Sequence, residues 1–254
     1  MLTALVTAIE AILFDMNGTL RLRVANESSQ QAAARRILKL LGMGAAPEAF
    51  WEKLKLRHKA YGQWAQQNLI QLSEEEIWTD WILPELPFTQ VATVASELTL
   101  AWFALKGQPV AREGAADTLS ALKQRGYRLG VISNSISRSE IPSSLEEYGW
   151  EGYFDAIIIS SLLKRRKPAP EPFWEAARTL QVDPAHCAFL GNRLSKDVAG
   201  CKVAGYGMAI LLEPSPELSP HELDVRFKPE VVIRSLPELL DIFPDRSLVC
   251  KMGS

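Results

Sequence analysis

Four side chains that could act together on a phosphoryl group follow short apolar runs of the sequence. Asp15 and Ser133 each come directly after such a run, and Lys167 and Asp197 come a few residues after two others. A carboxylate can attack phosphorus as a covalent nucleophile, and a hydroxyl and an ammonium can bind the phosphoryl oxygens. Two acids close together can hold a magnesium ion, which offsets their mutual repulsion. If one edge of the fold gathers these four side chains, the site suits phosphoryl transfer.

The elements that must position these residues alternate along most of the chain. Short apolar runs separated by helical patterns predict a parallel β-sheet covered by helices. The predicted strands are residues 11–14, 129–132, 156–159, 188–190, 208–212 and 231–233. The predicted helices between them are residues 114–124, 137–148, 170–180 and 195–204. Because ligands bind beyond the carboxyl ends of the strands in an open parallel sheet, we expect the four reactive side chains on one rim.

Residues 26–108 break this alternation, because they carry four helical patterns and no strand-like run. The four patterns cover residues 28–41, 47–65, 73–83 and 90–105. The sequence therefore predicts an α/β fold, a Rossmann-like parallel sheet with an inserted all-helical cap domain. The expected boundaries are residues 1–21 and 109–254 for the core domain and 22–108 for the cap domain.

The bulk composition excludes several classes of protein. With 254 residues, 47% of them hydrophobic, the chain can bury a sizeable core. A net charge of −2 gives no electrostatic reason to bind nucleic acid. No segment approaches the roughly 18 uninterrupted apolar residues of a membrane span. Three cysteines are too few to staple this fold or build a zinc site, so we expect a cytoplasmic protein. The histidines fall in no motif and are expected on the surface or in packing: His58, His186 and His221.

The order of four short motifs resembles a known family. "DMNGT", "ISNS", "KPAP" and "GNRLSKD" are similar to the four motifs of the haloacid dehalogenase superfamily, most of whose members are magnesium-dependent phosphatases. The resemblance runs from about residue 9 to residue 243, and the helical insert matches the cap of one branch. It implies that Asp15 is the nucleophile and a magnesium ligand. It also implies that Ser133, with Asn134 and Thr19, binds the substrate's phosphoryl group.

The same resemblance assigns the remaining site residues. Lys167 would neutralise the phosphoryl group and orient Asp15. The metal ion, Mg²⁺, would be held by Asp15 and Asp197, with the backbone carbonyl of Asn17 as a further ligand and Asn192 beside them. Lys167 ends the run of cations at 164–167, whose other three members we expect to be solvated.

Two positions depart from the family's pattern. Its phosphatases carry an aspartate at the position of Asn17, where it protonates the leaving oxygen and later activates water; an amide can do neither. The fourth motif usually begins Gly-Asp, whereas this chain has Gly191-Asn192, which removes a negative charge from the metal region. We therefore expect impaired catalysis. Asn17→Asp is expected to raise the hydrolysis of alkyl phosphates more than that of acyl phosphates, since only the former need a proton.

Three functions are open at this stage. The first is a magnesium-dependent phosphatase that acts through an aspartyl-phosphate on a small phosphorylated metabolite and is impaired by Asn17. The second is a catalytically silent binding or assembly protein that meets a protein partner through its cap. The third is a hydrolytic dehalogenase, in which Asp15 displaces a halide, although that branch usually has an aromatic residue where Asn17 stands. Assays on an aryl phosphate and on 2-chloropropionate, with and without magnesium, distinguish the three.

Overall fold

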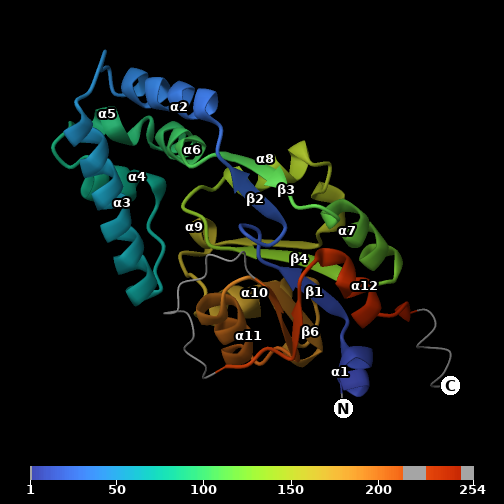
Figure 1. Ribbon diagram of the computed structural model, residues 1–254. Coiled ribbons are helices and arrows are strands. Elements are labelled where there is room, and N and C mark those ends of the chain that lie inside the picture. Colours follow the sequence, from blue (N-terminus) through green and yellow to red (C-terminus); the bar gives the residue numbers. More distant parts are fainter. Residues whose placement is uncertain (1, 214–226, 247–254) are drawn as a thin grey trace.

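A six-stranded parallel sheet forms the centre of the molecule (Figure 1). The structure is a computed structural model that describes residues 2–213 and 227–246. The strand order is β5-β4-β1-β6-β7-β8. The strands are β1 (Ala11–Phe14), β4 (Arg128–Ser133), β5 (Ala156–Ile159), β6 (Cys187–Gly191), β7 (Met208–Leu212) and β8 (Val231–Ile233). The α/β class and the six predicted strands are confirmed, and β4 and β6 extend slightly beyond the predicted runs.

Helices cover both faces of the sheet because alternate strand side chains point to opposite faces. In β1, Ile12 and Phe14 pack into one hydrophobic cluster, and Ala11 and Leu13 pack into the other. The helices on the first face are α1 (Leu2–Ala8), α7 (Ala115–Gln124), α8 (Glu140–Glu147) and α12 (Leu239–Ile242). Those on the second are α10 (Glu171–Leu180) and α11 (Ala199–Val203). Shorter pieces are η2 (Glu151–Tyr153), α9 (Ser160–Leu163), η3 (Pro184–His186), η4 (Leu194–Val198) and η6 (Leu236–Glu238).

The segment between the first two strands of the sheet forms a separate helical layer (Figure 1). Its elements are α2 (Glu27–Leu40), α3 (Glu48–Asn68), α4 (Glu74–Glu76), η1 (Ile77–Ile82), α5 (Phe88–Ala92) and α6 (Ala95–Leu105). Ser73 and Glu76 form a capping box at the start of α4. The predicted single helix at 90–105 is wrong, because the chain breaks between α5 and α6. There the Thr93 hydroxyl donates to the carbonyls of Thr89 and Gln90.

A two-stranded antiparallel ribbon joins the two layers and was not predicted. It pairs β2 (Arg21–Val24) with β3 (Gln108–Ala111). Both strands sit at the predicted domain borders, and most of β2 falls inside the range 22–108. The helical layer has its own hydrophobic cluster, which includes Trp78, and the Trp78 indole donates to the Thr99 hydroxyl at 2.8 Å. The division into core 1–21 with 109–254 and cap 22–108 remains our proposal, with this ribbon as the connection.

The strand order fixes where a ligand can bind. β1 lies between β4 and β6, so the carboxyl ends of these three strands are adjacent. The chain enters the helical layer after β1 and returns from it before β4. A ligand on this rim therefore lies where the strand order reverses and beneath the helical layer.

Candidate functional site

The loop after β1 holds Asp15 at the rim of the sheet. The Asp15 amide donates to the Leu190 carbonyl of β6 at 2.8 Å, which extends the strand pairing to this residue. Gly18 has φ +87°, and a Cβ there would lie 2.3 Å from the side-chain nitrogen of Asn192, Nδ2. Glycine is therefore required both by the backbone conformation and by the approach of Asn192. Thr19 donates to Asp15 Oδ2 at 3.3 Å.

Lys167 lies between two carboxylates. Its Nζ is 2.7 Å from Asp15 Oδ1 and 2.8 Å from Asp197 Oδ1, and it also donates to the Ile132 carbonyl at 2.8 Å. The Lys167 and Asp197 side chains are only 2% and 3% exposed. An ammonium with three acceptors is fully satisfied, so it is held rigidly against Asp15. Three of the four reactive residues predicted from the sequence are thus in contact, and the fourth, Ser133, ends β4 on the same rim.

The charges in this cluster shift each other's protonation. Burial, together with the negative charge of Asp197, raises the pKa of Asp15, against the opposing influence of Lys167. Burial acts to lower the pKa of Lys167, but the carboxylates of Asp15 and Asp197 outweigh it and raise that pKa. With Lys167 protonated and both acids ionised, the cluster keeps one excess negative charge. A cation or a protonated ligand at this rim would offset that excess.

Ser133 and Asn134 follow β4 but have different contacts. The Ser133 hydroxyl is buried and has no hydrogen-bond partner within the described part of the chain, so its capacity to donate is unused. The Asn134 side chain accepts from the Lys167 amide at 2.9 Å and donates to the Lys167 carbonyl at 3.0 Å. Both ends of the Asn134 amide are thus used to position the backbone of Lys167.

The residues expected at the metal surround one small cavity. It has a volume of about 200 Å³, and its lining includes Asp15, Asn17, Asn134, Lys167, Asn192, Arg193, Lys196 and Asp197. Asp197 Oδ2 accepts from the Arg193 amide at 3.0 Å. Within residues 2–213 and 227–246, no group of three or more His, Cys, Asp or Glu side chains could hold a metal. Two carboxylates with nearby amide and carbonyl oxygens still fit magnesium, which binds few protein carboxylates and retains waters or substrate oxygens.

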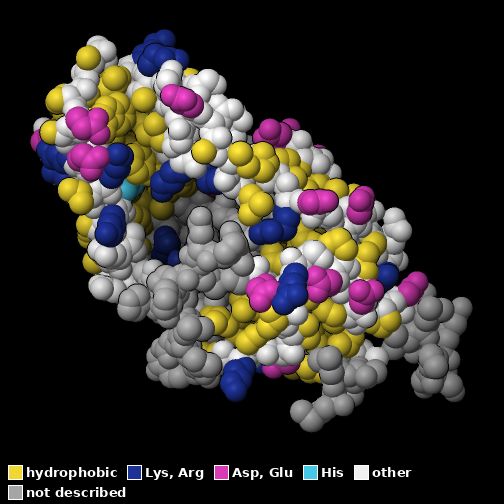
Figure 2. Space-filling view, in the orientation of Figure 1, with side chains coloured by type: hydrophobic (Ala, Val, Ile, Leu, Met, Phe, Trp, Pro, Cys, Tyr) yellow, Lys and Arg dark blue, Asp and Glu magenta, His cyan; other side chains and the backbone are white. Residues whose placement is uncertain are grey.

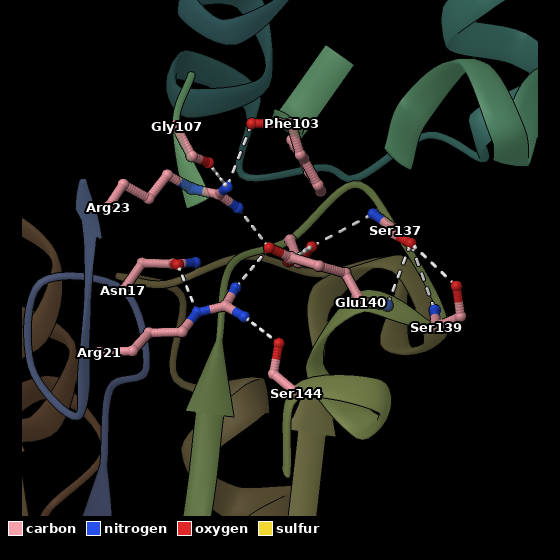
Figure 3. A network of polar contacts seen from close by, with 10 residues as sticks. Asn17, Arg21, Arg23, Phe103, Gly107, Ser137, Ser139, Glu140 and Ser144 are labelled. Carbon is pink, nitrogen blue, oxygen red and sulfur yellow. Dashed lines mark hydrogen bonds and ion pairs between the residues drawn. The ribbon is translucent and has the colours of Figure 1, made fainter. Parts of the chain in front are cut away.

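Asn17 is fixed by a buried arginine (Figure 3). Arg21 Nε donates to Asn17 Oδ1 at 2.9 Å, while the two other nitrogens of Arg21 donate to Ser144 and Glu140, each at 2.5 Å. Because a guanidinium can only donate, the carbonyl oxygen of Asn17 must face Arg21 and its NH₂ group points away. Glu140 also forms an ion pair with Arg23. The NH₂ group of Asn17 is therefore the donor that this residue can offer to a ligand.

A second cavity opens between the sheet layer and the helical layer. Its volume is about 260 Å³, and it shares Asn17 and Asn134 with the first cavity. The space-filling view shows this hollow with Lys and Arg side chains on its rim (Figure 2). The remaining lining residues are Arg23, His58, Tyr61, Gly62, Phe103, Lys106, Ser135, Ile136, Glu140 and Arg166.

Several of these residues were missed from the sequence. His58 is a packing residue as expected, since it stacks on Trp102 with ring centroids 4.0 Å apart, but it also lines the second cavity. The expectation that Arg166 is solvated is wrong, because its side chain is half-buried beside Lys167 and lines this cavity. Arg21 could have been noticed as an arginine directly after an apolar loop residue, but its partner lies 119 positions away. His221 lies outside the described residues.

Comparison with known proteins gives matches over most of the chain. The haloacid dehalogenase-like hydrolase profile matches residues 9–205. A glyceraldehyde 3-phosphate phosphatase of Methanopyrus kandleri is 30% identical over 199 residues, which are 78% of this chain and 81% of that protein. The pyrophosphatase PpaX of Halalkalibacterium halodurans is 29% identical over 130 residues, which are 51% of this chain and 58% of that protein. The first alignment is therefore close to full length, and the second spans little more than half of the relative.

The solved structures extend the comparison to the fold. A 2-haloacid dehalogenase from Pseudomonas syringae pv. tomato has a TM-score of 0.67 and 23% identity, covering 92% of this chain and 97% of that one. At this identity the likeness supports the fold and not the reaction. Among the described residues, no helix is long and apolar enough to cross a membrane.

Proposed function

The chain belongs to the haloacid dehalogenase-like hydrolase family, and from that premise we propose that it is a phosphatase that acts through an aspartyl-phosphate on Asp15. One observation carries the proposal: the buried Asp15–Lys167–Asp197 cluster lies at the sheet rim where β4 ends in Ser133, whose hydroxyl has no partner among the described residues. The curated relatives are named a glyceraldehyde 3-phosphate phosphatase and a pyrophosphatase, which supports a small phosphorylated metabolite as the substrate.

In the first step the Asp15 carboxylate attacks phosphorus. A bond forms between an Asp15 oxygen and phosphorus, and the bond from phosphorus to the leaving oxygen breaks. Lys167 holds the carboxylate in place, and the Ser133 hydroxyl donates to a phosphoryl oxygen. In the second step water attacks the same phosphorus, which releases phosphate and returns the Asp15 carboxylate.

Asn17 makes both steps slower for different reasons. Its NH₂ group can donate a hydrogen bond to the leaving oxygen but cannot transfer a proton, so the first step favours leaving groups that depart as anions. In the second step no carboxylate at position 17 accepts a proton from the attacking water. Acyl and aryl phosphates should therefore phosphorylate Asp15 quickly, and the aspartyl-phosphate should accumulate.

Magnesium is the proposed metal ion. Asp15, Asp197, the backbone carbonyl of Asn17 and Asn192 would hold it, and it would neutralise the charge of the phosphoryl oxygens. Removal of one acid at position 192 reduces the negative charge available to it, so we expect weak binding. The proposal also includes a cytoplasmic location, which the buried free cysteines Cys187 and Cys201 support.

A silent binding protein is the second candidate, and two features favour it. The Lys167 ammonium already bridges the two carboxylates, and the side-chain oxygen of Asn17 is already held by Arg21. In that case the cleft would bind a phosphorylated compound without turning it over. A protein partner at the helical layer belongs to this second candidate.

The test is a rapid-mixing experiment with 4-nitrophenyl phosphate and magnesium. We expect a burst of about one nitrophenolate per protein molecule, slow turnover afterwards, and a phosphate group on Asp15 by mass spectrometry. Asp15→Asn is the matched control and should show neither burst nor phosphate. Absence of both signals in the wild-type protein would reject the phosphatase in favour of the binding protein, and chloride release from 2-chloropropionate would indicate a dehalogenase.

A further inference from the structure

The cavity beneath the helical layer has more positive than negative charge in its lining. Its cations are Arg23, Lys106 and Arg166, and its acid is Glu140. Glu140 is already shared between Arg21 and Arg23. Among the described residues, no lining acid therefore remains to neutralise Lys106 or Arg166. These three cations line the cavity, and Figure 2 shows Lys and Arg side chains around the hollow between the two layers.

Lys106 has only aromatic neighbours as partners. It directly follows α6, and its ammonium lies 5.4 Å from the Trp102 ring centroid and 6.0 Å from that of Phe103. In the part of the chain that the structure describes, it forms no ion pair. Burial and the positive charge of Arg23 lower the pKa of Lys106, and the negative charge of Glu140 is too small an influence to offset them. A bound anion would supply that charge.

Arg166 approaches the same cavity from the sheet layer. It precedes Lys167 in the chain, and its guanidinium donates to the Gln71 side-chain oxygen, a neutral partner. Burial lowers the pKa of Arg166 from its usual value, and the neighbouring Tyr61 partly opposes this shift. A guanidinium stays protonated at all physiological pH values, so the cavity keeps this charge.

The cationic cavity continues into the phosphoryl site. The two cavities share Asn17 and Asn134, so one small molecule can reach from Asp15 to the helical layer. A volume of about 260 Å³ is enough for a short chain and a charged end group but is small for a macromolecular segment.

We propose that the substrate is a small phosphomonoester that carries a second anionic group, a carboxylate or a phosphate, bound by Lys106 and Arg166. The phosphoryl end rests on the proposed function, because it assumes that Asp15 receives the phosphoryl group. The second end is independent of turnover, since it requires only that the cavity bind an anion. Arg23 contributes to the positive potential while it stays paired with Glu140.

Three phosphonates that cannot be hydrolysed test the proposal in the wild-type protein with magnesium. Propylphosphonate has a neutral end, 3-phosphonopropionate has a carboxylate, and 1,3-propylenebisphosphonate has a second phosphonate. Calorimetry should show at least one of the two compounds with a second anionic group binding about tenfold or more tightly than propylphosphonate, since a charge-assisted contact is gained. The preference should fall as salt is raised. Which of the two binds more tightly identifies the second group.

Variants locate the preference in this cavity. Lys106→Gln and Arg166→Gln should each reduce the ratio of the two affinities several-fold, with melting curves showing that each variant is folded. Lys59→Gln is the matched control, because Lys59 is an exposed lysine of α3 outside both cavities, and it should leave the ratio unchanged. Equal binding of all three compounds, or a preference that survives in both variants, would overturn the proposal.

Separate outcomes identify separate failures. A clear preference for the phosphonates with a second anionic group, with no nitrophenolate burst, would reject the phosphatase and keep the anion site. A burst on Asp15 without any preference among the phosphonates would keep the phosphatase and reject the second anionic group.

Discussion

Asn17→Asp is expected to restore the base of the second step more fully than the acid of the first. In this variant the new carboxylate would take the place of the amide oxygen that accepts from Arg21 Nε at 2.9 Å. Arg21 is fully buried and cannot turn towards solvent. An ionised carboxylate next to this guanidinium would be stabilised, which favours proton acceptance from water and opposes proton donation to a leaving group.

The magnitudes separate two types of substrate. General acid or base assistance contributes about 10²- to 10⁴-fold to a rate. A guanidinium in direct contact reduces the protonated fraction of a carboxyl group by about 10- to 1000-fold. Turnover of 4-nitrophenyl phosphate, limited by water attack, should therefore rise by about 10² or more. Turnover of propyl phosphate, which needs a proton on the leaving oxygen, should rise by about tenfold or less at neutral pH and more as the pH falls.

Steady-state kinetics on the two phosphates provide the assay. Asn17→Asp combined with Asp15→Asn should remove every gain, and Asn17→Asp combined with Arg21→Gln should improve propyl phosphate hydrolysis relative to Asn17→Asp alone, provided melting curves show a folded protein. A gain that is larger on propyl phosphate than on 4-nitrophenyl phosphate would refute the role given to Arg21. The sequence alone led us to expect the larger gain on alkyl phosphates. The contact between Arg21 and position 17 leads us to expect the opposite order.

Three further outcomes are expected. Asn192→Asp should tighten magnesium binding about tenfold or more by adding a carboxylate near Asp197, and calorimetry without such a gain would remove position 192 from the metal site. Ser133→Ala should change the free energy of unfolding by less than about 1 kcal/mol, since the hydroxyl has no partner, yet weaken phosphate binding measurably; a large loss of stability would contradict its availability to a ligand. Burial and the charge of Lys106 lower the pKa of His58 from 6.5 to about 3, so the unfolded chain binds the extra proton and stability falls as the pH drops through that window. His58→Phe should reduce the slope of unfolding free energy against pH by about 1.4 kcal/mol per pH unit between pH 6 and pH 4, and an unchanged slope would show that His58 is not buried as a neutral group.

The rim of the sheet could be predicted because its positions follow from chain order. Each apolar run predicts a buried parallel strand, and parallel strands end on the same side, so Asp15 and Ser133 must lie near one another. The placement of Lys167 and Asp197 on the same rim follows from the same rule, because they come after β5 and β6. The distances within the cluster could not be predicted, because a linear pattern does not specify side-chain geometry.

The partners of Arg21 and Arg166 could not be predicted for a different reason. Arg21 contacts Glu140, and Arg166 contacts Gln71, across 119 and 95 positions of the chain. No periodic pattern links residues at such separations. The two-stranded ribbon was missed because each of its strands is only four residues long and mostly polar or exposed.

The helical layer was predicted as a layer but not helix by helix. Apolar periodicity predicts which face of a segment is buried, and the cluster around Trp78 agrees with it. Helix starts and breaks depend on local hydrogen bonds instead. Asn26 caps α2 by accepting from the Ser29 amide, and the helical pattern at 90–105 is interrupted where Val94 leaves the helical conformation.

Glu140 serves two arginines at once, and this limits the order in which substitutions can accumulate. Loss of Glu140 alone would leave the fully buried Arg21 without its counter-ion, at a cost of about 3–5 kcal/mol. Exchange of Arg21 alone would leave Asn17 without the donor that orients it. The four positions 17, 21, 23 and 140 are therefore epistatic: an aspartate at position 17 has a different effect before and after Arg21 is replaced. The effect of exchanging the amide for a carboxylate at position 17 therefore depends on which of the other three positions have already changed.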